Sequence, residues 1–253
     1  MRKFLLLLSV FTVSFLVYSP VWAGVHVEGR YWFTKLDSKL QVTDYNVTGS
    51  EIYMKDTLGA DNTENFWEAK IDLNSGSHHF IYSYMPLSWD GTKAPDNSIN
   101  FAGSTYSANT TIESSLDIIY QRAGYKYTIG NEAGNQFGLI VDFKLLDVDA
   151  NLRNSSPLNK SYRVTGIIPT VGFAAGIGLP HGFAVGAEVT GIGYNGNHLF
   201  DGEVAVSFNY IPYTTISGGY RMIDIKLGEQ YKAGNDKADF TIRGPFLMVR
   251  AGF

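Results

Sequence analysis

Hydrophobic residues recur at every second position over several stretches of this chain, and that pattern most constrains what it can fold into. In the segment 137–145 the odd positions are all apolar, while the even positions include Asp142 and Lys144. The segments 67–73, 185–190 and 203–210 alternate in a similar way. Because successive side chains of a strand point to opposite faces, each segment predicts a β-strand with one apolar and one more polar face.

Composition separates two all-β folds that share this alternation, a soluble β-sandwich and a membrane barrel. Charged residues make up only 17% of the chain, against roughly 25% in ordinary soluble domains. Aromatic residues reach 14% and glycines number 27. No stretch beyond the N-terminal region has the roughly 18 consecutive apolar residues of a membrane-spanning helix, and mean hydropathy is -0.06. We therefore expect an all-β, antiparallel transmembrane β-barrel.

Ten strands are expected from the alternation. They are 25–36, 65–74, 77–88, 114–129, 136–147, 162–178, 182–194, 201–211, 214–227 and 240–253. Bacterial barrels have an even number of strands, so about ten is the leading count, with about eight or twelve as alternatives.

The connections between these strands alternate in length. Those at 74–77, 130–135, 179–182 and 211–213 are short, whereas those at 37–64, 89–113, 148–161 and 228–239 are long. Short periplasmic turns and long outer loops are typical of outer-membrane barrels. With this phase, both ends of the barrel domain are expected on the periplasmic side.

The first residues have the pattern of a cleavable secretory signal. Arg2 and Lys3 precede an apolar run that ends at Tyr18, and small residues then mark a cleavage site. The expected division is a signal peptide at 1–23 and one barrel domain at 24–253. Cysteine is absent, so neither a disulfide framework nor a thiolate metal site is possible.

Two places do not fit continuous alternation. Apolar residues occupy even positions around Leu116 but odd positions around Tyr125, which predicts a bulge at 122–124. Pro169 lies inside an expected strand, where it removes a ladder hydrogen bond, so we expect a bulge or a later strand start there. Aromatic residues near strand ends are candidates for two interfacial girdles. They are Tyr31, Trp32, Trp67, Tyr82, Tyr84, Tyr125, Tyr127, Tyr210, Tyr213 and Tyr220.

The last seven residues, from Leu247 to Phe253, place apolar side chains on one face. This ending resembles the final-strand signal that outer-membrane barrels present to their assembly machinery. The segments 49–59, 78–84, 219–221 and 244–247 resemble a poorly characterised proteobacterial outer-membrane β-barrel protein family. The resemblance implies location in the outer membrane, contact with outer-membrane lipid and the barrel assembly machinery, and Phe253 as the assembly signal. It implies no activity and carries over no other site residue.

Charged residues on the polar phase of the expected strands are predicted to line the lumen. They are Arg30, Glu68, Lys70, Asp72, Asp117, Asp142, Lys144, Glu188, Glu203, Arg221 and Arg250. Buried charges are costly unless paired or hydrated. We therefore expect these residues either to form an ion-pair network in a narrow barrel or to face water in the lumen. Small residues are expected on the facing wall. They are Gly172, Ala174, Ala184, Gly186, Ala205, Ser207 and Gly219.

Residue types that carry catalysis or bind metals form no recognisable constellation. The five histidines lack metal-ligand spacing, and His78 and His79 would point to opposite faces of a strand. His198 beside Asp201 is the nearest candidate for a catalytic pair, and a polar loop contact is the simpler interpretation. The motif G-x-G-x-x-G at 191–196 closes a strand instead of opening a helix. No catalytic residue, metal or cofactor is expected, and scattered basic residues with a net charge of -4 exclude a nucleic-acid binder.

The favoured function is that of a non-enzymatic barrel, either a narrow pore for small polar solutes or a structural barrel with surface loops. One alternative is a barrel enzyme that acts on outer-membrane lipid or peptide. It would require a histidine within hydrogen-bond reach of a serine or carboxylate beside a groove. Another alternative is a surface protein whose aromatic loops, including Tyr45, Tyr53 and Trp89, bind a ligand.

Overall fold

The computed structural model describes residues 24–44, 47–130, 134–154, 158–228 and 236–253. The expected signal peptide at 1–23, Tyr45 and the side chain of Tyr210 lie outside the described part. Within that part, none of the helices has the length and apolar character needed to span a membrane.

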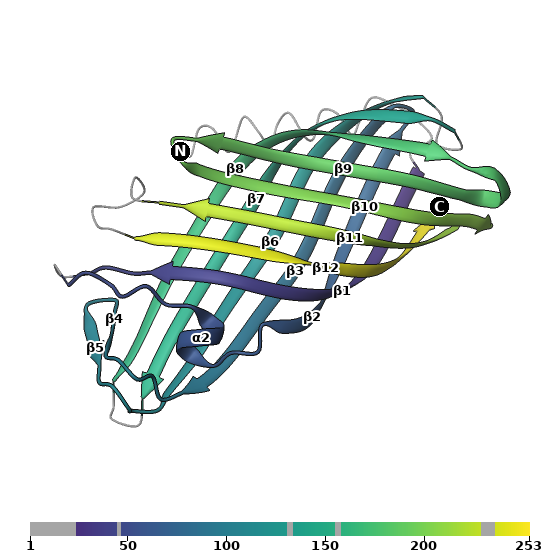
Figure 1. The fold of residues 1–253 in the computed structure, drawn as a ribbon. Coiled ribbons are helices and arrows are strands. Elements are labelled where there is room, and N and C mark those ends of the chain that lie inside the picture. Colours follow the sequence, from purple (N-terminus) through teal and green to yellow (C-terminus); the bar gives the residue numbers. More distant parts are fainter. Residues whose placement is uncertain (1–23, 45–46, 131–133, 155–157, 229–235) are drawn as a thin grey trace.

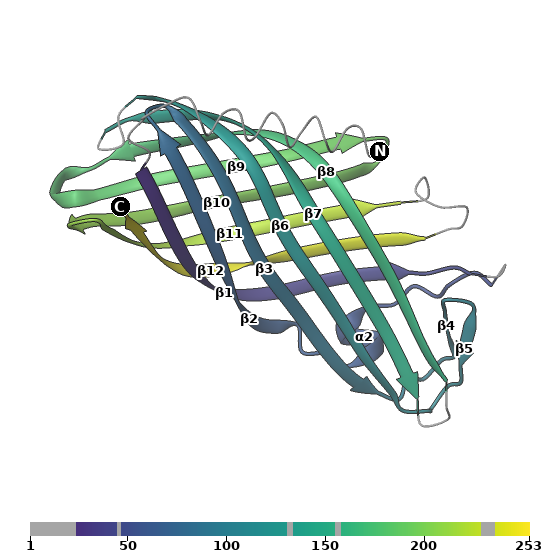
Figure 2. The same cartoon turned by 180° about the vertical axis from the view of Figure 1, so that it is seen from behind.

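Ten long strands form one closed barrel, and each is antiparallel to both of its neighbours (Figures 1 and 2). They are β1 (Gly24–Gln41), β2 (Thr63–Ser75), β3 (His78–Lys93), β6 (Ile112–Gly130), β7 (Gln136–Asn154), β8 (Asn159–Gly178), β9 (Phe183–Tyr194), β10 (Asn197–Ile211), β11 (Thr214–Leu227) and β12 (Lys237–Gly252). Their order around the barrel is their order in the sequence, and β12 closes the ring against β1. The expected fold class and strand number are confirmed.

The two ends of the barrel differ in their connections. Four short connections lie at one end, which we call the short-turn end. Val25 and Phe253 meet there, because the backbone N–H of each donates to the carbonyl of the other, at 3.1 and 2.8 Å. The opposite, or loop, end carries the longer connections at 42–62 and 94–111. These connections contain helix α2 (Met54–Leu58) and the hairpin of β4 (Ile99–Phe101) and β5 (Ser104–Tyr106).

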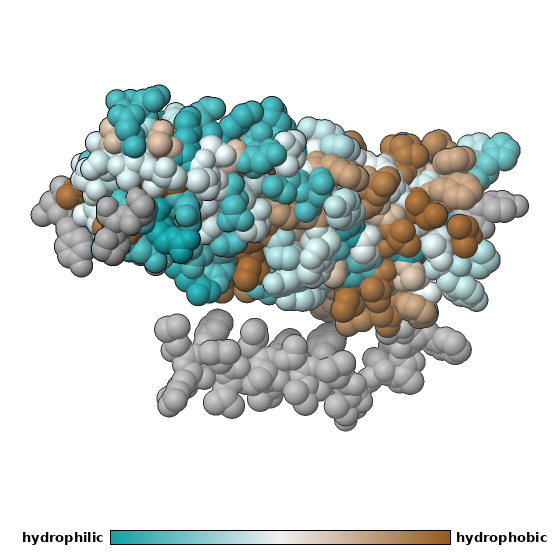
Figure 3. All heavy atoms as spheres, turned by 90° about the horizontal axis from the view of Figure 1, so that it is seen from below, coloured by the Kyte–Doolittle hydropathy of each residue, from teal (hydrophilic) through white to brown (hydrophobic). Residues whose placement is uncertain are grey.

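A belt of apolar residues surrounds the outward face near the short-turn end. On β7 the belt runs from Phe137 to Leu145, and its side chains Phe137 to Phe143 are 44% to 54% exposed. The outward residues Val206, Leu247, Val249 and Phe253 of β10 and the C-terminal segment are 51% to 81% exposed. A belt of this height suits strands that cross a bilayer at a tilt, which takes roughly 9–11 residues. On the face seen in Figure 3, hydrophobic residues gather towards the short-turn end.

One expected girdle residue points the other way. Trp32 lies on the inward phase of β1, where it is fully buried and its indole Nε1 donates to the carbonyl of Gly244 at 2.9 Å. Other predicted girdle residues do lie outward and exposed. They are Tyr31, Trp67, Tyr82, Tyr127, Tyr213 and Tyr220.

Beyond the belt, the two faces of the strands exchange character. On β6 the inward Leu116 and Ile118 are buried, while the outward Asp117 between them bonds to the Ser88 hydroxyl at 2.6 Å. The β6–β7 register is unbroken along the whole of β6, so the expected bulge at 122–124 is wrong. The alternation changes because the strand leaves the membrane: its outward face meets water, and its inward face packs into protein.

The long connection expected at 148–161 is also wrong, and the same exchange of polarity is the reason. β7 continues to Asn154 and β8 already begins at Asn159. Along this stretch the inward Ala150 and Leu152 are buried, so the segment is paired strand with reversed polarity.

Pro169 lies inside β8 where the register with β7 is unbroken, and neither of the two expected irregularities occurs. It pairs in register with Phe143 of β7. The ladder between β8 and β9 runs from Gly178↔Ala184 to Val171↔Gly191, so it stops short of the proline. Proline is tolerated where a strand has one neighbour, because its missing N–H then need not break a ladder bond.

We call the part of the barrel between the belt and the loop end the protruding half, and the rest the membrane half. In the protruding half, the inward faces of β3, β6, β7 and β8 pack against those of β1, β10, β11 and β12. The resulting apolar cluster, which we call the outer core, includes Trp32, Leu36, Trp89, Leu116, Ile118, Leu152, Leu199, Ile223, Ile225, Phe240 and Ile242. The β4–β5 hairpin caps it with the fully buried Phe101 and Tyr106, whose hydroxyl donates to the Leu152 carbonyl at 2.7 Å. Trp89 is therefore a core residue and not a surface ligand contact, whereas Tyr53 is 41% exposed.

Candidate functional site in the barrel interior

The structure brings ten of the eleven predicted lumen residues to the inward face. They are Arg30, Glu68, Lys70, Asp72, Asp142, Lys144, Glu188, Glu203, Arg221 and Arg250. Asp117 is the exception, since it lies on the water-facing side of β6 beyond the belt. The prediction fails there because the rule that polar residues face inward holds only where the outward face meets lipid.

Most of the inward charges meet at mid-height in what we call the charged layer. It consists of Arg30, Glu68, Arg122, Asp142, Lys144, Glu188, Asp201, Glu203 and Arg221. Sequence reasoning missed Arg122 because of the supposed bulge. It also missed Asp201, which was considered only as a partner of His198. Glu28 was overlooked although it shares the inward phase of Arg30.

Arg221 is the centre of one side of the charged layer. Its guanidinium donates two hydrogen bonds to Asp201, at 2.9 and 2.8 Å, and a third to Glu68 at 2.7 Å. The guanidinium carbon lies 5.4 Å from the ring centre of Trp32 and 5.8 Å from that of Tyr120. Such contacts stabilise a desolvated cation beyond its ion pairs.

Arg30 extends this side of the layer towards β10. It forms ion pairs with Glu203 at 2.7 Å and with Glu68 at 3.2 Å. The ring centre of Phe246 lies 4.3 Å from the guanidinium carbon of Arg30. Glu68 is therefore shared by two arginines from different strands.

The other side of the layer is built around Asp142. Arg122 reaches Asp142 and Glu188, both at 2.5 Å. Lys144 is fully buried and lies 3.3 Å from Asp142 and 3.2 Å from Asp201. Each buried charge thus has an opposite partner, which is the condition for burying charges without a prohibitive desolvation penalty.

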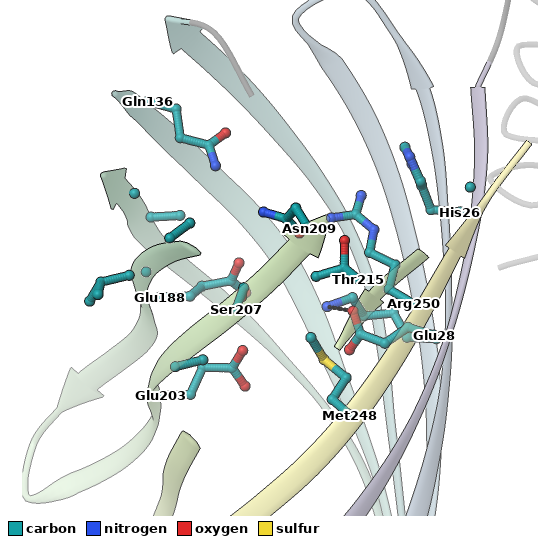
Figure 4. Close-up of a pocket in the computed structure, with 18 of the residues that line it drawn as sticks. His26, Glu28, Gln136, Glu188, Glu203, Ser207, Asn209, Thr215, Met248 and Arg250 are labelled. Carbon is teal, nitrogen blue, oxygen red and sulfur yellow. Dashed lines mark ion pairs between the residues drawn. The ribbon is translucent and has the colours of Figure 1, made fainter. Parts of the chain in front are cut away.

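Between the charged layer and the short-turn end lies a cavity of about 670 Å³, which we call the vestibule. Arg250, Glu188 and Glu203 point into it in Figure 4. Five of the small residues expected to face the charges lie on its wall. They are Ala174, Ala184, Gly186, Ala205 and Ser207.

The described histidines are dispersed. His198 faces outward and bonds through Nε2 to Asp224 at 2.7 Å, while Asp201 faces inward to Arg221. The candidate pair of His198 with Asp201 is therefore wrong, because odd and even positions of β10 face opposite sides. His79 faces inward and lies 3.1 Å from Asp72. Among the described residues, no three His, Asp or Glu side chains are grouped as a metal site would require.

The glycine motif at 191–196 ends β9 and forms the tight turn to β10. Asn195 and Gly196 have φ values of 50° and 80°, the left-handed pair that a two-residue hairpin turn favours. The motif is thus used for chain reversal.

Comparison with known proteins gives the fold alone. No protein-family model and no curated protein sequence matches the chain. The outer membrane protease OmpT from Escherichia coli is 10% identical, with a TM-score of 0.59, and the match covers 91% of this chain and 97% of that one. Ail, the attachment invasion locus protein of Yersinia pestis, is 10% identical, covering 91% and 99%, with a TM-score of 0.40. Neisserial surface protein A is 12% identical, covering 90% and 97%, with a TM-score of 0.39. This chain has the fold of the outer-membrane β-barrels.

Proposed function

We propose that this protein is a non-enzymatic outer-membrane barrel that carries a rigid, closed platform outside the membrane. The observation that supports the proposal is the succession of two filled layers inside the barrel. A solute that entered the vestibule would first meet the buried ion pairs of the charged layer and then the outer core. Both would have to open before a polar solute crossed, so the structural version of the function is favoured over the pore.

Export and assembly belong to the same proposal. The segment 1–23 would direct the chain across the inner membrane and be removed, and the apolar belt would then contact outer-membrane lipid. Phe253 is 81% exposed beside Val25, an accessible position for recognition by the barrel assembly machinery.

Planar-bilayer recording with the full chain tests the closed barrel. We expect no stepwise conductance above that of the bare bilayer. Strand content by circular dichroism should first show that the inserted protein is folded. Reproducible single-channel steps from folded protein would favour the pore for small polar solutes instead.

A second candidate function, a barrel enzyme acting on lipid or peptide, is favoured by a histidine–carboxylate contact on the outward face. His198 and Asp224 pair on the outward face just beyond the belt, where Thr241 also donates to Asp224 at 2.6 Å. Burial raises the pKa of Asp224, but the hydrogen bonds from Thr241 and His198 outweigh it and hold this pKa below its ordinary value. A histidine oriented in this way suits a general base. Hydrolysis of lipid or peptide substrates that His198→Asn abolishes would establish this function, and equal turnover by both proteins would remove it.

A further inference from the structure

We propose that the vestibule binds a small molecule carrying an oxyanion, either a carboxylate or a phosphate, that enters from the short-turn end. The inference concerns a site that the closed barrel does not itself require. It would hold whether or not the barrel conducts.

The carboxylates that line the vestibule already have cationic partners in the charged layer. Glu188 is paired with Arg122 at 2.5 Å. Arg30 holds Glu203 at 2.7 Å and also lies 3.4 Å from Glu28. Each of these three carboxylates therefore has an arginine of the charged layer as a partner.

The cations that line the vestibule are less well matched. Lys70 shares Glu28 with Arg30, at 3.1 Å. Among the described residues, Arg250 forms an ion pair with Asp72 alone, at 3.3 Å, and that carboxylate also accepts from His79. Lys70 and Arg250 thus each depend on a carboxylate that already has another partner.

Lys126 is the clearest case. It lines the cavity from β6, and in the part of the chain that the structure describes it has neither an ion pair nor a side-chain hydrogen bond. In register it neighbours His79 on β3, whose ring faces Asp72 and, through it, Arg250. Lys126 and Arg250 therefore flank one side of the cavity, where an oxyanion would supply the missing partner.

The opposite wall leaves room for the rest of such a molecule. A cavity of about 670 Å³ falls within the roughly 300–1,000 Å³ of small-molecule sites. At Gly186 an added Cβ would meet only the Ala175 carbonyl oxygen, at 3.6 Å, so a larger side chain there can extend into the cavity. The small residues thus keep space open opposite the cations.

Calorimetric titration of the full chain, refolded in non-ionic detergent, tests the proposal with inorganic phosphate, citrate and uncharged glycerol as probes. We expect phosphate or citrate to bind and glycerol not to bind. The tighter of the two anions would assign the site to phosphate- or carboxylate-bearing molecules. Lys126→Gln should weaken binding about tenfold, the effect of losing one charged hydrogen bond.

Two further variants separate the vestibule from the surface. Gly186→Leu should abolish binding by filling the cavity, while keeping every charge. Lys226→Gln removes an exposed lysine on the outward face and should leave binding unchanged. The proposal is overturned if neither anion binds the wild-type chain. It is also overturned if Gly186→Leu, with wild-type strand content by circular dichroism, binds as the wild type does.

Discussion

The membrane half and the protruding half of the barrel are built from the same strands but have opposite polarity. In the membrane half, β7 presents Val141 outward and Asp142 inward, whereas further along the strand the outward residue is Asp147 and the inward one is Leu152. The environment decides which face is apolar: lipid lies outside the first half, and protein core lies inside the second. Alternation thus reports that a strand has two faces, and the surroundings decide which of them is inward.

The two halves also differ in what holds their interiors together. The membrane half encloses ion pairs and a cavity, so its inward side chains are stabilised by charge matching. The outer core is stabilised by burial of apolar surface, as in a soluble β-sandwich. Substitutions that are similar chemically should therefore have different effects in the two halves.

The largest effect is expected from Arg221→Met in the charged layer. The change leaves Asp201 buried without its main partner and should lower the free energy of unfolding by about 3–5 kcal/mol. The urea midpoint of the full chain refolded into lipid vesicles measures it. Arg243→Met is the matched control, because its pair with Asp37 is half exposed and should be worth about 0–1 kcal/mol. Similar small losses in both variants would contradict a stabilising charged layer.

Removing the same side chain from each half should give the next largest difference. Leu116→Ala in the outer core should cost about 2–5 kcal/mol, because it opens a cavity in packed protein. Leu139→Ala in the belt should cost less, since lipid replaces the lost contacts. Vesicle refolding with denaturant titration compares them. A greater penalty at Leu139 would mean that the assignment of the two environments is reversed.

Adding a charge to one outward face should locate the membrane boundary. Val141→Arg places a cation against lipid and should cost about 2–4 kcal/mol near the midplane. Asn151→Arg lies on the same face of β7 beyond the belt, where a surface change is usually within about 0.5 kcal/mol. Equal penalties in the same unfolding assay would show that both positions share one environment.

The smallest expected effect is a local change in titration outside the membrane. Hydrogen bonds from Arg163 hold the pKa of Asp147 below its ordinary value. A lowered pKa contributes stability above the unfolded-state value, and that contribution is lost as the pH falls through the folded-state value. Arg163→Gln should move the pKa of Asp147 upward, as followed by carboxyl chemical shifts. An unchanged pKa would show that this ion pair does not form in solution.

Much of the fold could be predicted from the sequence, because strand number and lipid-facing positions depend on local alternation. All ten expected strands occur, and the apolar residues that alternate with the predicted lumen residues Asp142 and Lys144 face outward. The errors at Asp117, at 122–124 and at 148–161 share one cause. The period of two does not change where a strand leaves the bilayer. The alternation therefore continues there, but the apolar residues face inward instead of outward.

The interior could be predicted only in outline. Inward phase identified Arg30 and Glu68, but their partners lie on strands far away in the sequence, such as Glu203 and Arg221. Pairing across a barrel depends on strand tilt and side-chain reach, and neither can be read from one segment. The same limit hid the association of Lys126 with the vestibule.

The β1–β12 seam has a consequence for the order in which the barrel folds. Every other pairing in the ring joins neighbouring barrel strands of the sequence, with at most the β4–β5 hairpin between them, whereas the seam joins His26 to Gly252. Bringing together such distant residues requires more chain entropy to be lost before any contact forms. A chain that has made the other pairings is still an open sheet. Its two edge strands, β1 and β12, have unpaired backbone groups that can bind a strand of another protein. Closing the seam pairs both edge strands at once, so it is the step at which the chain becomes protected from misassembly.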